Sequence, residues 1–82
     1  MKKLVVKVAE KEKKTVTIQT DYIRLDAALK LADAVQTGGH AKLVITEGDI
    51  KVNGEVCTQR GKKLRDGDTM ELDHVLYTIS QE

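Results

Sequence analysis

Two short segments of the sequence combine residues that suit phosphate binding. In the first, Thr37, Gly38 and Gly39 precede a predicted helix, and a helix N-terminus presents unpaired backbone N–H groups and a partial positive charge. Glycine at the first two helical positions leaves room for a phosphodiester to approach those amides, with His40 and Lys42 as nearby donors. The alternative is that the glycines only turn the chain between two tightly packed helices. A nucleotide-binding P-loop is excluded, because TGGHAK lacks the GKS or GKT ending that supplies a P-loop's lysine and magnesium ligand.

The second segment is the basic loop QRGKKLR, residues 59–65, which carries four cations, and Gly61 lies among them. Arg and Lys on a loop can contact successive phosphates, and the Arg guanidinium can do so in a bidentate way. We therefore predict that Arg60, Lys62 and Lys63 contact phosphates. The alternative is a solvated surface that resists aggregation.

Three residues of the first predicted helix complete the set. Arg24 and Lys30 are candidate RNA contacts, and the Asp26 carboxylate could accept a hydrogen bond from a base or a ribose 2′-OH. Asp26 could instead only favour the helix N-terminus or pair with a nearby Lys. The site predicted from these residue types consists of Arg24, Asp26, Lys30, Thr37, Gly38, Gly39, His40, Lys42, Arg60, Lys62 and Lys63.

The sequence contains no comparable pattern of residues that indicates catalysis. Cys57 is the only cysteine, and neither His40 nor His74 has metal-ligand spacing with it. Asp66 and Asp68 flank Gly67, as in a turn. We predict no enzyme, metal, cofactor or small-molecule substrate.

Composition bounds the remaining possibilities. The 82 residues fit one domain, and 2% aromatic residues argue against recognition by base stacking. A lone cysteine, the lack of a signal-peptide pattern and the absence of a long apolar run predict a soluble cytoplasmic protein, expected to be monomeric. The net charge is only +1, but residues 66–82 hold five acids and no Lys or Arg, so the basic residues gather elsewhere. Such a polarised molecule can present one positive face.

The elements that must position these residues follow from hydrophobic periodicity. Apolar alternation at Leu4–Val8 and Val16–Ile18 predicts an N-terminal β-hairpin in residues 1–19. A first helix is predicted over about 24–34, with Thr20 or Asp21 as N-cap, and a second from Thr37 to a stop at Gly48.

The remainder of the chain predicts strands. Asn53 and Gly54 indicate a type I′ hairpin, residues 66–68 a turn, and Asp73 and His74 a reversal between two closing strands. The predicted class is α+β, with two short helices on a small, mostly antiparallel sheet.

Residues 24–72 resemble the S4 RNA-binding domain, and among its members the short stand-alone S4-like proteins of bacteria. The shared elements are RLD at the first helix, TGG and then AK at the second, the GDIKVNGE hairpin, and RGKKLRDGD before the closing strands. The ordered set is far more specific than any one of its pieces. The resemblance implies an αL-type fold whose two helices and basic loop face structured RNA, typically ribosomal or transfer RNA, in ribosome assembly or translation. We assign residues 20–82 to an S4-like domain. Residues 1–19 fall outside the resemblance, and their apolar alternation predicts an added hairpin that stabilises the sheet and does not contact RNA.

Two other classes stay open at this point. VNGE followed by a DGD turn also resembles small β-grasp sulfur carriers, although the sequence ends in SQE where a carrier has diglycine. A protein-interaction module docked through its acidic C-terminal segment is the third interpretation.

Overall fold

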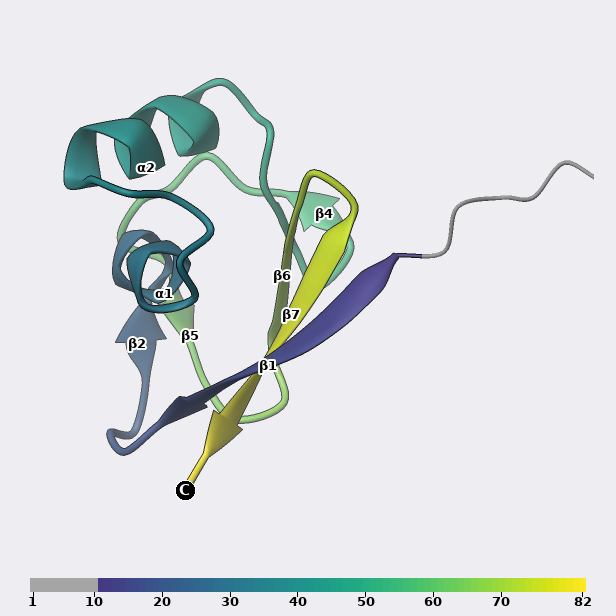
Figure 1. Cartoon of the computed structure of the whole chain (residues 1–82). Coiled ribbons are helices and arrows are strands. Elements are labelled where there is room, and N and C mark those ends of the chain that lie inside the picture. Colours follow the sequence, from purple (N-terminus) through teal and green to yellow (C-terminus); the bar gives the residue numbers. More distant parts are fainter. Residues whose placement is uncertain (1–10) are drawn as a thin grey trace, which may run out of the picture.

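The computed structural model describes residues 11–82, which form two helices and seven strands (Figure 1). Five strands form one sheet in the order β1-β7-β6-β3-β4, and β2 and β5 form a separate two-stranded ribbon. This arrangement confirms the predicted class. The elements in chain order are β1 (Glu12–Ile18), β2 (Ile23–Arg24), α1 (Leu25–Leu31), α2 (Gly38–Thr46), β3 (Lys51–Val52), β4 (Glu55–Val56), β5 (Lys63–Leu64), β6 (Thr69–Leu72) and β7 (Val75–Gln81).

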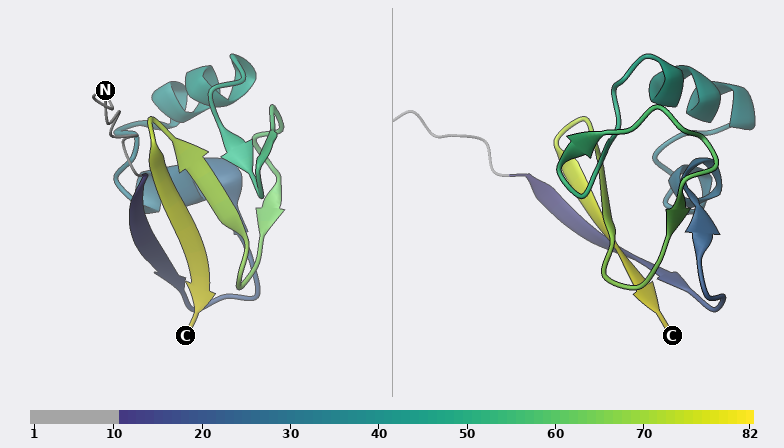
Figure 2. Two further views of the ribbon diagram at one scale, coloured as in Figure 1. Left: turned by 90° about the vertical axis from the view of Figure 1, so that its right-hand side faces the viewer. Right: turned by 180° about the vertical axis from the view of Figure 1, so that it is seen from behind.

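Strand β1 is the exception to the antiparallel pairing. It runs parallel to β7, from Glu12 opposite Val75 to Ile18 opposite Gln81 (Figure 2). Val16 and Ile18 alternate into the core, at 5% and 4% exposure. The predicted hairpin paired this strand with residues 4–8, which lie outside the described residues. The second strand of the predicted hairpin lies in β1, and β1 joins the sheet by pairing with the C-terminal strand, β7.

Helix α1 is shorter than the predicted span of 24–34. Asp33 has a φ of 61°, and its N–H donates to the Lys30 carbonyl while the Ala34 N–H donates to the Leu29 carbonyl. This is the Schellman pattern, with Asp in place of the usual Gly at the left-handed position, so the helix ends at Leu31.

The predicted N-cap of α1 was wrong. Arg24 occupies the N-cap position, and its side chain makes no capping hydrogen bond. Thr20 and Asp21 lie too far back in the chain, because Ile23 and Arg24 are drawn into β2 by pairing with β5.

The predicted bounds of α2 are confirmed at both ends. The Thr37 Oγ1 atom accepts a hydrogen bond from the His40 N–H at 3.0 Å, which makes Thr37 the N-cap. Gly48 has a φ of 80° and follows the helix, with its N–H bound to the Ile45 carbonyl. The segment TGG therefore lies at a well-defined helix N-terminus.

The β3–β4 hairpin and the 66–68 turn hold the far end of the basic loop. Asn53 and Gly54 have φ angles of 52° and 89°, as the type I′ prediction requires. The Asn53 Oδ1 atom accepts from the Thr69 N–H at 2.9 Å, and Asp68 Oδ2 accepts from the Arg65 N–H at 2.7 Å. These bonds fix the chain where the loop enters β6.

The core lies between the helices and the sheet. Leu64 is fully buried in it, although its sequence neighbours are cations. Burial of this one apolar side chain anchors the loop while the cations remain exposed. The buried residues are Val16, Ile18, Leu25, Ala28, Leu29, Val35, Ala41, Ile45, Ile50, Val52, Leu64, Met70, Leu72, Tyr77 and Ile79.

Candidate functional site

The N-terminus of α2 is open at its two glycines. Outside the helix's own backbone and adjoining residues, a Cβ built on Gly38 would meet no heavy atom within 4 Å, and one on Gly39 would meet only Thr37 Oγ1, at 3.9 Å. Neither glycine has a positive φ. Packing and backbone conformation would thus accept a side chain at both positions. The alternative that these glycines serve close helix packing loses its physical basis.

The N-terminus of α1 is closed by the basic loop. The Leu25 N–H donates to the Lys62 carbonyl at 2.8 Å, and the Asp26 N–H donates to the Arg60 carbonyl at 3.2 Å. The next amide, that of Ala27, donates to the Asp26 carboxylate at 2.8 Å. Backbone atoms of the loop therefore fill the positions that an anion would occupy at this helix.

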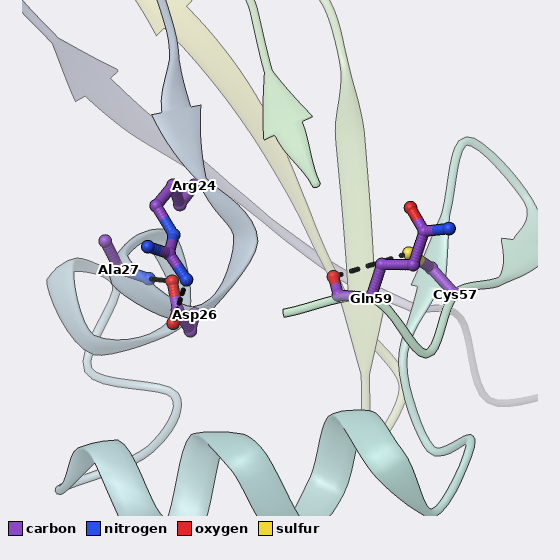
Figure 3. A network of polar contacts seen from close by, with 5 residues as sticks. All are labelled: Arg24, Asp26, Ala27, Cys57 and Gln59. Atoms are coloured by element: carbon purple, nitrogen blue, oxygen red, sulfur yellow. Dashed lines mark hydrogen bonds and ion pairs between the residues drawn. The ribbon is translucent and has the colours of Figure 1, made fainter. Parts of the chain in front are cut away.

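Arg24 is held beside the loop by Asp26. The Arg24 Nη2 atom lies 3.2 Å from Asp26 Oδ2, while Oδ1 caps the helix amide of Ala27 (Figure 3). A Cβ on Gly61 would lie 3.7 Å from Arg24 Nη2, so the guanidinium rests close to the loop backbone. Both carboxylate oxygens of Asp26 already accept hydrogen bonds. The contacts support the alternative in which Asp26 acts within the protein, although its partner is Arg24 and not a Lys.

A shallow depression brings together predicted residues from both helices. It has a volume of about 250 Å³ and is lined by Arg24, Asp26, Ala27, Lys30 and Gly38. Four of these five residues were predicted from the sequence. The depression therefore links the open N-terminus of α2 to Arg24 at the end of β2 and to Lys30 of α1.

The cations of the predicted site are mostly unpaired. Within residues 11–82, the ion pairs are Lys11–Glu71, Lys14–Glu12 and Arg24–Asp26. A phosphate can thus bind most of the site without first displacing an internal carboxylate. In this described part of the chain, the site cations without an ion pair are Lys30, Lys42, Arg60, Lys62 and Lys63.

The other predicted residues do not line the depression beside Gly38. His40 and Lys42 are exposed on α2 and line neither of the two depressions described here. Lys62 lines a separate depression of about 330 Å³ beside the β3–β4 hairpin. Sequence reasoning missed Tyr22. Its ring lies within 6 Å of two cations, Lys63 in β5 and Arg65 just after it.

The described residues, 11–82, include neither a cluster of metal ligands nor a membrane-spanning helix. Their His, Cys, Asp and Glu side chains do not form any group of three that could hold a metal ion. Neither helix of this region has the length and apolar character needed to cross a bilayer.

Comparison with known proteins supports the resemblance seen in the motifs. The sequence profile of the S4 domain family matches residues 16–80. Over 58 residues, the chain is 43% identical to the probable ribosome maturation protein RlbA of Bacillus subtilis (strain 168). That similarity covers 71% of this chain and 82% of the relative.

Replacing Gly38 or Gly39 with Ala should stabilise the fold. Both sites have room for a Cβ and no positive φ, so each change should raise the free energy of unfolding by about 0.4–1 kcal/mol in urea denaturation. Gly54→Ala is the control and should lower it, because Gly54 has a φ of 89°. Destabilisation by Gly38→Ala and Gly39→Ala would show instead that the fold requires these glycines.

Proposed function

The chain belongs to the S4 domain family, and from this premise we propose that it is a non-catalytic RNA-binding module that acts on ribosomal RNA during ribosome assembly. The ribosomal assignment draws on the name of the Bacillus subtilis relative. It would place the protein in the cytoplasm. Transfer RNA is the competing ligand and serves as a competitor in the binding experiments below.

The open N-terminus of α2 is the observation that carries the proposal. Glycine costs helix stability, and neither packing nor φ demands it at Gly38 or Gly39. A ligand that must approach the backbone closely supplies a reason for both residues. A phosphate fits, because the exposed amides and the helix dipole favour an anion there.

The surrounding residues suit a polyanion better than a single small anion. Arg24 and Lys30 line the depression beside Gly38. The basic loop is held at the N-terminus of α1, because the backbone carbonyls of Arg60 and Lys62 cap that helix. In this proposal Thr37 and Asp26 position the site, Thr37 by capping α2 and Asp26 by holding Arg24. His40 and Lys42 supply further donors from the exposed side of α2.

Gly39→Glu should strongly weaken RNA binding without unfolding the protein. The carboxylate would put bulk and negative charge where the phosphate is proposed to lie, while Glu is favourable in the first turn of a helix. Affinity for a hairpin of bacterial ribosomal RNA should fall at least about tenfold. Filter binding, with transfer RNA as competitor, measures this affinity, and thermal unfolding checks the fold.

Thr15→Glu is the matched control, since it adds the same charge on exposed β1. The α2 site would be wrong if Gly39→Glu bound as tightly as the wild type or if both variants lost affinity equally.

Removing the loop cations should weaken binding and its dependence on salt. Ala at Arg60, Lys62 and Lys63 should cost about 0.5–1.5 kcal/mol per residue, while α1 stays capped because the loop caps it through carbonyls. Contact with about three to five phosphates gives the wild type a log–log salt slope of roughly −2 to −4, and each lost contact should reduce its magnitude by about 0.7.

The control variant replaces Lys11, Lys13 and Lys14 with Ala and removes the same charge from residues at and beside β1. Equal losses in the two triple variants would mean that the protein binds RNA as a nonspecific polycation.

A further inference from the structure

The β2–β5 ribbon has one apolar face and one basic face. Ile23 pairs with Leu64 and Arg24 pairs with Lys63. Leu64 is fully buried and Ile23 packs against the core, so this pair faces inward. Because side chains alternate along a strand, Arg24 and Lys63 point outward together. Both are exposed.

Tyr22 and Arg65 continue this outward face, one residue beyond each strand. Tyr22 is 39% exposed, and its ring centroid lies 4.8 Å from Lys63 Nζ and 5.5 Å from Arg65 Cζ. These distances are within the range of cation–π attraction. Among residues 11–82, neither Lys63 nor Arg65 forms an ion pair. The ring therefore holds two cations in place without neutralising them.

This face is continuous with the proposed RNA site. Arg24 lies on it and also lines the depression beside Gly38. Side chains two residues apart on one face of a strand are about 6.6 Å apart, a separation at which neighbouring cations can contact successive phosphates of one strand. Holding long side chains in position before binding also reduces the entropy that binding costs.

Resting on the proposed function, we infer that Tyr22, Arg24, Lys63 and Arg65 form one RNA-binding surface, the outer ribbon face, which extends the proposed site by Tyr22 and Arg65. Arg24, Lys63 and Arg65 bind phosphates of the RNA strand that continues past the α2 N-terminus. Tyr22 is a positioning residue, which acts by holding Lys63 and Arg65. An acidic protein segment is the alternative partner for such cations, but it would not explain why the face adjoins the glycines of α2.

Charge removal tests the surface itself. Arg65→Gln should weaken binding of a bacterial ribosomal RNA hairpin about three- to tenfold and reduce the magnitude of the salt slope by about 0.7. Lys13→Gln, on exposed β1, is the control and should change neither quantity. If Arg65→Gln matched the wild type while Gly39→Glu abolished binding, the outer ribbon face would be refuted and the proposed function would stand. If the wild type bound no RNA, both would fail.

The role of Tyr22 is tested by its dependence on the two cations. Tyr22→Phe keeps the ring and should preserve affinity, whereas Tyr22→Leu should lower it about threefold with an unchanged salt slope, because the charges remain. In a background that carries Lys63→Gln and Arg65→Gln, Tyr22→Leu should have no further effect. An undiminished loss in that background would mean that the ring contacts RNA directly and would overturn the positioning role.

Discussion

The capping of α1 by the basic loop is the contact on which the geometry of the proposed RNA site depends. Two backbone amides of α1, those of Leu25 and Asp26, donate to the carbonyls of Lys62 and Arg60. Without these bonds and the buried Leu64 anchor, a loop of like charges would sample many conformations, and ordering it would cost free energy. Because the loop caps the helix through its backbone, its cationic side chains stay free for a ligand.

The two helix N-termini differ. The loop caps that of α1, whereas among residues 11–82 the side chain that caps α2 is that of Thr37, and this N-terminus lies beside the depression at Gly38. The amides of Gly38 and Gly39 are thereby left as the helix terminus that suits an anion. Glycine lowers the helix propensity at these two positions, as the proposed phosphate site would require. Lys63 and Arg65, in and beside β5, extend the positively charged surface beyond Arg24.

Much of the fold could be predicted because its signals are local. The Thr37 cap, the stop at Gly48 and the Asn53–Gly54 turn each depend on a few adjacent residues, and all three are confirmed. The N-cap of α1 could not be predicted, because its partners come from a loop distant in the sequence. The parallel pairing of β1 with β7 leaves no pattern in the sequence. Strands β2 and β5 have two residues each and are too short to show a periodicity. Tyr22 escaped notice for the same reason, since only the ribbon brings it to Lys63 and Arg65.

The most direct test of the account observes the backbone amides of α2 during RNA binding. In nuclear magnetic resonance spectra of the folded protein titrated with a ribosomal RNA hairpin, the amide signals of Gly38 and Gly39 should shift saturably at low salt. They should return toward their free positions as salt is added. The amides of Leu25 and Asp26, already bonded to the loop, should move less. Saturable shifts confined to β1 and β7, with Gly38 and Gly39 unchanged, would contradict the account.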